Sequence, residues 1–278
     1  MIDLRKMGNR LSYTTILVYA VFLLGGCEPL PKMISYGSNE YSQLEFEGTS
    51  FQHNPLISNY RDIWAGENFS IALYLSQTEY NGNNGNLLDP GMYCKGDSSL
   101  GQCDLPDSLF EILSDLTNYS DLKLGFNHGL LNYSLSEPND MGQPSIAPTS
   151  GKHLVAWGDN SFGQTTVPEL AEYSSVYMTA VGGNHNVIYF YDGEFFRIIS
   201  WGDNSFGQCD VPSRFNSISD SLNILSIDAG ARHTIVTYDS SGTLKMAAWG
   251  DNSYGQLNIP SQEQLNGNLS LLEVRCGY

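Results

Sequence analysis

The chain repeats one octapeptide along its length, and this self-similarity constrains the fold more than any other feature. Two copies read WGDNSFGQ, at 157–164 and 201–208, and a third reads WGDNSYGQ at 249–256. Weaker copies are KGDSSLGQ at 95–102 and YGSNEYSQ at 36–43. A unit of this size cannot bury its apolar face alone, so neighbouring repeats must stack or close into a ring. The positions that define the complete copies are Trp157, Gly158, Gln164, Trp201, Gly202, Gln208, Trp249, Gly250 and Gln256.

A second motif lies between the octapeptides: a short apolar run, then Gly, two further residues, and usually His. Phe69 takes the place of His in the first copy, which a packing role tolerates better than a catalytic one. We interpret the histidines as structural groups that tie adjacent strands, and the tryptophans as core anchors of each repeat. The remaining copies pair Gly125 with His128, Gly182 with His185, and Gly230 with His233.

The spacing of apolar residues predicts strands on both sides of each motif, with alternation such as that over 234–238. Asp192-Gly193 and Ser241-Gly242 are typical of hairpin turns. Most octapeptides continue into a segment that ends in Pro, which predicts a short fourth strand at an outer edge. These segments are 103–106, 165–168, 209–212 and 257–260. Four short strands per repeat predict an all-β propeller, with four complete blades and a split or truncated fifth.

The two linked motifs, W-G-D-N-x-x-G-Q followed by A-G-x-x-H, resemble the repeat of the regulator of chromosome condensation family. The resemblance covers roughly residues 34–278 and implies a β-propeller. It implies no particular activity, because the eukaryotic prototype exchanges nucleotide on a nuclear small GTPase whereas many bacterial members are extracytoplasmic binding proteins.

The N-terminus predicts export. Three basic residues, Arg5, Lys6 and Arg10, precede the apolar stretch 16–24, which is too short for the roughly 20 residues of a membrane-spanning helix. We therefore expect a signal peptide over 1–26.

The sequence Leu24-Gly25-Gly26-Cys27 resembles a bacterial lipobox. That resemblance implies a lipidated Cys27 as the first mature residue, a tether over 27–33, and a propeller domain over 34–278. Because Glu28 follows rather than Asp, it also implies sorting to the outer membrane of the bacterial envelope. The alternative is an ordinary signal peptide that is cleaved elsewhere.

The chain is acidic, with a formal net charge of −17 at pH 7. Loss of residues 1–26 removes three basic residues and one acidic residue, which makes the charge −19. Such a surface repels nucleic acid, so we expect no nucleic-acid partner. No calcium-binding loop pattern is present, and Asp-Asn-Ser is typical turn chemistry, so we expect neither a metal nor a cofactor.

Four cysteines follow Cys27, and export permits disulfides. Cys94 and Cys103 fall in neighbouring strands of one predicted blade, although their pairing stays open. Cys103 and Cys209 occupy equivalent positions in separate blades, which disfavours a bond between them. Cys276 takes a slot where a small buried residue is expected.

Two repeats carry extra residues between their second and third strands, at 76–92 and 136–151. Insertions of this kind gather on one face of a repeat protein, which is often the binding face. The candidate contact residues are Tyr80, Met92, Met141 and Ile146. The alternative is that both segments are flexible Asn-, Gly- and Pro-rich decoration.

No nucleophile elbow, phosphate loop or zinc-protease motif is present in the sequence. We therefore predict a non-catalytic, lipid-anchored module that binds a protein or glycan of the envelope. One alternative is a hydrolase or lyase built on the central face of the propeller. Another is a truncated, nonfunctional fragment, because 271–277 reads as an inner strand after which further strands are expected; a split five-bladed ring and an open arc also stay open.

Overall fold

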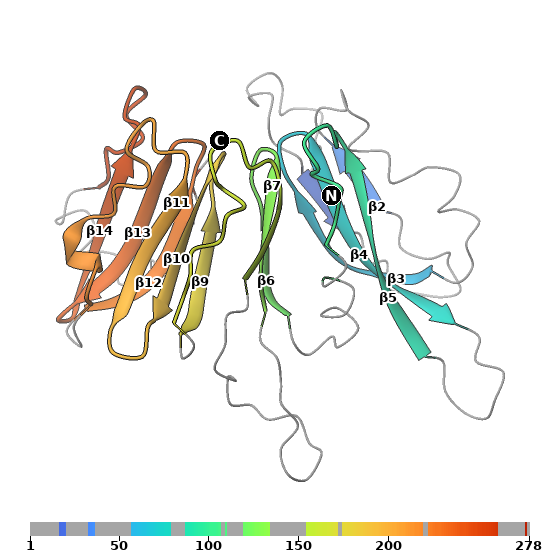
Figure 1. Cartoon of the computed structure of the whole chain (residues 1–278), viewed down its shortest axis with the longest axis horizontal. Helices are drawn as coiled ribbons and strands as arrows, with labels where there is room; N and C mark the ends of the chain where they lie inside the picture. Colours follow the sequence, from blue (N-terminus) through green and yellow to red (C-terminus); the bar gives the residue numbers. More distant parts are fainter. Residues whose placement is uncertain are drawn as a thin grey trace, which may run out of the picture. The chain divides into compact units, whose positions relative to one another are not determined.

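The structure is a computed structural model that describes residues 17–20, 33–36, 57–78, 87–106, 109, 119–133, 154–171, 174–218, 222–260 and 276. The chain forms two compact units, Met1–Asp97 and Ser98–Tyr278. Both units are built from antiparallel β-sheets (Figure 1). Among the described residues, no helix combines the length and the apolar character needed to cross a membrane.

The first unit contains two sheets. In the smaller one β1 (Leu17–Ala20) pairs with β2 (Met33–Tyr36). In the larger one β3 (Ile57–Ala65), β4 (Phe69–Thr78) and β5 (Leu87–Gly96) form three antiparallel strands with β4 in the centre. Because β1 lies inside the predicted signal peptide, β2 would lose this partner in a chain that is cleaved before Cys27.

The second unit contains three sheets of the same design, each with the second strand of its repeat in the centre. The predicted alternation of strands and hairpins is therefore confirmed for these repeats. The sheets consist of β6 (Tyr119–Leu124), β7 (His128–Tyr133) and β8 (Leu154–Gly158); β9 (Ser175–Val181), β10 (His185–Tyr191) and β11 (Phe196–Gly202); and β12 (Leu222–Ala229), β13 (His233–Ser240) and β14 (Thr243–Gly250).

The first strands of these three sheets lie beside one another in chain order, because β6 contacts β9 and β9 contacts β12 (Figure 1). A continuous core fills the space between the last two sheets, with Val187 and Tyr189 on one side and Ile227 and Val236 on the other. The 3₁₀ helix η3 (Ser213–Phe215) closes this core, since Phe215 is fully buried. Successive repeats thus bury their apolar faces against each other.

The expected fourth strand is not formed in the described residues: the four sheets from β3 to β14 have three strands each, and the segments that end in Pro are turns and irregular chain. The reason is local hydrogen bonding. The Thr166 N–H donates to the Gly163 carbonyl at 3.1 Å, and the Val167 N–H donates to the Thr165 carbonyl at 3.1 Å. Donors that are used inside a turn cannot join a ladder, and the Pro that follows has none.

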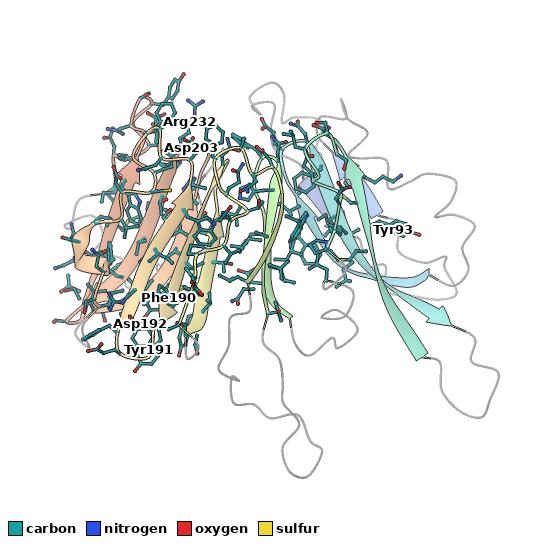
Figure 2. All side chains as sticks on the ribbon, viewed as in Figure 1. Tyr93, Phe190, Tyr191, Asp192, Asp203 and Arg232 are labelled. Atoms are coloured by element: carbon teal, nitrogen blue, oxygen red, sulfur yellow. The ribbon has the colours of Figure 1, made fainter. Side chains whose placement is uncertain are left out.

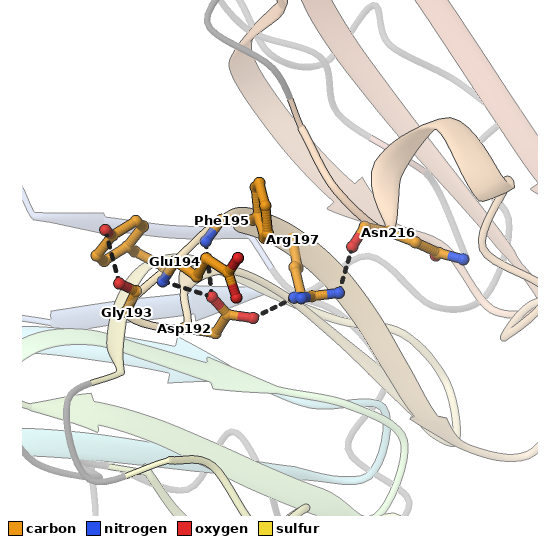
Figure 3. Close-up of polar contacts among 7 residues, drawn as sticks. Asp192, Gly193, Glu194, Phe195, Arg197 and Asn216 are labelled. Atoms are coloured by element: carbon orange, nitrogen blue, oxygen red, sulfur yellow. Dashed lines mark hydrogen bonds and ion pairs between the residues drawn. The ribbon is translucent and has the colours of Figure 1, made fainter.

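Hairpins close the edge of the sheets that lies away from the octapeptides. In the β10–β11 turn the Asp192 carboxylate accepts hydrogen bonds from the Phe195 and Glu194 N–H groups, at 2.7 and 2.9 Å, and from the Arg197 guanidinium (Figure 3). The backbone bonds, led by that from Phe195, lower the pKa of Asp192 to about 2. Arg197 also donates to the Asn216 carbonyl at 2.6 Å, so this turn is fastened to the segment after η3.

Candidate functional site

The two recurring motifs meet at one edge of each sheet. The Gly that follows Trp pairs with the His of the second motif, as Gly202 does with His185. Gly202 has φ 105°, and a Cβ added there would lie 2.5 Å from the Asn184 carbonyl oxygen, so only Gly fits. The same pairing joins Gly158 to His128 and Gly250 to His233.

We call the turns at 98–102, 159–164, 203–208 and 251–256 the octapeptide edge. It lies opposite the hairpin edge, where Tyr191 pairs with Phe196 and Ser240 pairs with Thr243. Figure 2 shows Asp203 and Arg232 at one end of the sheets and Tyr191 and Asp192 at the other.

The side chains of each octapeptide bond to their own turn. In the copy at 157–164, Asp159 accepts the Ser161 N–H at 2.9 Å and the Gln164 side-chain amide at 3.0 Å. The Gln164 side-chain oxygen accepts the Phe162 N–H at 2.8 Å. Asn160 accepts the Thr165 N–H at 3.0 Å. The polar side chains therefore serve as turn-forming groups.

The main-chain carbonyl of the octapeptide Gln, unlike these side chains, accepts hydrogen bonds from the following repeat. The indole N–H of the next Trp donates to it in every described case. Gln164 also accepts the Asn186 side-chain amide at 2.8 Å, and Gln208 accepts the Thr234 hydroxyl at 3.3 Å. The indole bonds run from Trp157 to Gln102 at 3.0 Å, from Trp201 to Gln164 at 3.0 Å, and from Trp249 to Gln208 at 2.9 Å.

His128 and His185 bond to the next sheet, whereas the sequence led us to expect bonds between adjacent strands. The His128 Nε2 lies 3.0 Å from the Asn186 side-chain oxygen, and the His185 Nε2 lies 3.0 Å from the Thr234 hydroxyl. Because the Asn186 amide group already donates to the Gln164 carbonyl, its oxygen must accept from His128. This network assigns the proton to Nε2 of both imidazoles.

Both histidines are neutral near pH 7. Burial lowers the pKa of His128 and of His185 to about 4. Their Nδ1 atoms are buried and have no hydrogen-bond partner among the described residues. Protonation of Nδ1 would therefore create a buried positive charge that no hydrogen-bond acceptor stabilises. These groups act as donors that hold neighbouring sheets in register.

The described cysteines offer no thiolate near neutral pH. Cys94 and Cys103 are both disulfide-bonded, and Cys209 and Cys276 are free thiols. Burial raises the pKa of Cys209, and it raises that of Cys276 to about 12. In the part of the chain that the structure describes, no group of three or more His, Cys, Asp or Glu side chains is placed to hold a metal ion.

One position of the octapeptide faces outward. The sixth residue is a large apolar side chain in each described copy, and its N–H is held by the Gln of its own turn. These exposed apolar side chains occupy equivalent positions in successive turns, and we refer to them as the apolar row. The exposed fractions are 48% for Leu100, 49% for Phe162, 40% for Phe206 and 94% for Tyr254.

The sequence signal for this row is a sixth residue that is large and apolar between Ser and Gly in the copies at 95–102, 157–164, 201–208 and 249–256. We predicted only turn structure for the octapeptide and a binding surface on the two insertions instead. Met92 is wrong as a contact residue, because it lies in β5, pairs with Leu73 and is 8% exposed. The other candidates, Tyr80, Met141 and Ile146, lie outside the described residues.

No protein-family model and no curated protein matches this chain. Among solved structures it is similar to human WBSCR16, with 16% identity over 89% of this chain and 66% of that chain, and a TM-score of 0.52. It is also similar to the CRINKLY WD40 ectodomain of the Arabidopsis thaliana receptor kinase ACR4, with 16% identity over 79% of this chain and 63% of that chain, and a TM-score of 0.41. The likeness to WBSCR16 is one of fold, and the chain spans about two thirds of that protein.

We predict that stability falls as the pH drops from 6.5 to 4. In this range the unfolded chain binds a proton at His128 and at His185, whose ordinary pKa is 6.5, while the folded chain does not. Each residue then lowers the free energy of unfolding by up to roughly 3 kcal/mol, with no further loss from it below pH 4. Urea unfolding at pH 7 and at pH 4.5 measures this loss.

The matched variant is His185→Gln, whose side-chain amide also donates to Thr234 but does not titrate. Its loss of stability between the two pH values should be smaller than that of the parent by up to roughly 3 kcal/mol. An equal loss in both proteins would show that His185 is not the group that titrates.

Proposed function

We propose that this protein is a non-catalytic binding module that recognises a protein partner through its octapeptide edge. The observation that carries the proposal is the outward row of Leu100, Phe162, Phe206 and Tyr254, which the fold repeats at one position of successive turns. The polar side chains of the octapeptides and their Trp indoles instead form hydrogen bonds within their own turn or with a neighbouring repeat. The apolar row is therefore what the edge offers to a partner.

The proposal includes a propeller of the regulator of chromosome condensation type. Support comes from the neighbouring first strands β6, β9 and β12, from the linked motifs, and from the fold likeness to WBSCR16. The proposal keeps the predicted number of blades, four complete blades and a split or truncated fifth.

The proposal of a non-catalytic role draws support from the chemistry of the recurring groups. His128 and His185 are neutral donors in buried bonds between sheets. The free thiols of Cys209 and Cys276 have raised pKa values, which keeps them protonated near neutral pH. These are the residue types that would otherwise supply a nucleophile or a base.

We further propose that the chain is exported and anchored in the bacterial envelope by lipid on Cys27. Expression in a bacterial host, followed by membrane fractionation and intact mass, should give a membrane-bound species that begins at Cys27 and carries acyl chains. The variant Cys27→Ser should lack the mass of the acyl chains and should be absent from the membrane fraction. An unacylated parent chain would remove the anchor but leave the binding proposal standing.

A photo-crosslinking experiment tests the binding surface. The full chain carries benzoylphenylalanine in place of Phe162 or Tyr254, and envelope fractions of the native host supply the partner. We expect one discrete protein adduct at both positions. Phe195, which is 38% exposed at the hairpin edge, is the matched control and should give none. Equal adducts at both edges, or none at the octapeptide edge, would contradict the proposal.

A further inference from the structure

One ring of the apolar row already carries a cation. The Arg232 guanidinium carbon lies 4.3 Å from the centre of the Phe206 ring, which is within the range of a cation–π interaction. Arg232 directly precedes His233 of the second motif. This position places Arg232 at the octapeptide edge, next to the turn at 203–208 that carries Phe206. Within this chain, the face of the Phe206 ring therefore binds a guanidinium group.

Among the residues that the structure describes, the equivalent rings have no such occupant. The residue before His in the preceding repeat is Asn184 rather than Arg. In the described part of the chain, no cationic side chain lies over Phe162 or Tyr254. Tyr254 is 94% exposed and Phe162 is 49% exposed, so both ring faces are open to a partner.

The charges around these rings also favour a cation. Each turn carries a carboxylate at the third position of its octapeptide, Asp159 in the turn of Phe162 and Asp251 in the turn of Tyr254. Hydrogen bonds from Ser253 lower the pKa of Asp251, so this carboxylate is ionised at neutral pH. The whole chain has a net charge of −17, which attracts a basic partner over a longer range.

We propose that Phe162 and Tyr254 are binding positions for arginine side chains of a basic protein segment, which they hold by stacking as Phe206 holds Arg232. Arginine fits better than lysine, because its planar guanidinium stacks on a ring and is more weakly hydrated. This inference rests on the proposed binding function of the octapeptide edge and names the chemistry of its partner.

The test uses the full chain and three synthetic peptides, octa-arginine, octa-lysine and octa-glutamate, with dissociation constants measured by fluorescence anisotropy at physiological salt. Octa-arginine should bind several-fold more tightly than octa-lysine, and octa-glutamate should not bind. Phe162→Ala and Tyr254→Ala should each weaken octa-arginine binding roughly two- to fivefold, the loss expected for an exposed cation–π contact. Phe195→Ala should leave it unchanged, and thermal melts confirm that each variant is folded.

A second comparison separates stacking from net charge. Arg232→Ala and Lys245→Ala each remove one positive charge, but only Arg232→Ala uncovers a ring, that of Phe206. Octa-arginine should therefore bind Arg232→Ala more tightly than Lys245→Ala. Equal affinity for the two cationic peptides together with unchanged binding of Phe162→Ala and Tyr254→Ala would overturn the inference, as would absence of binding. If the octapeptide edge still crosslinks to a protein in that case, the proposed function stands and only the chemistry of the partner is wrong.

Discussion

The structure of the second unit depends on the main-chain carbonyl of the octapeptide Gln. This oxygen belongs to one repeat and is satisfied by the next, through an indole N–H at 2.9–3.0 Å. A buried carbonyl without a partner is costly, so each repeat is stable only when its successor is in place. The Gln side chain meanwhile fixes the turn that presents this carbonyl, as Gln164 does with Asp159. One residue therefore couples the local shape of a turn to the packing of two sheets.

This arrangement explains how a structural repeat can carry the binding surface that we propose. In the turns at 159–164 and 203–208, Asp, Asn, Ser and Gln are occupied by hydrogen bonds within the turn, and the Trp of each copy is directed toward the preceding repeat. The sixth residue is the position that the turn leaves outward, and it is apolar in each described copy. The apolar row is thus a by-product of the element that holds the repeats together, and in the proposed function the groups beside each ring decide which partner binds. At Phe206 that neighbour is Arg232.

The sequence predicted the strands and hairpin turns of the described repeats, because alternation, β-branching and Gly placement are local signals. It failed where the answer depends on a neighbour in space. The segment 209–212 alternates like a strand, yet its donors are used in the turn before it. The bond from His128 to Asn186 crosses to another sheet, which no spacing within one repeat reveals. We predicted a loop position for Met92, because the composition of 76–92 does not show where β4 ends and β5 begins.

The most direct test of this account removes a single hydrogen-bond donor and leaves the packing intact. Trp249 is replaced in the full chain by benzothienylalanine, which has the shape of tryptophan but sulfur in place of the indole N–H, and the free energy of unfolding is measured in urea. The account predicts a loss of about 0.5–1.5 kcal/mol, because the Gln208 carbonyl loses the shorter of its two hydrogen bonds, that from the indole at 2.9 Å, and keeps only that from the Thr234 hydroxyl at 3.3 Å. An unchanged free energy of unfolding would show that Trp249 contributes by packing alone and that the carbonyl does not couple the repeats.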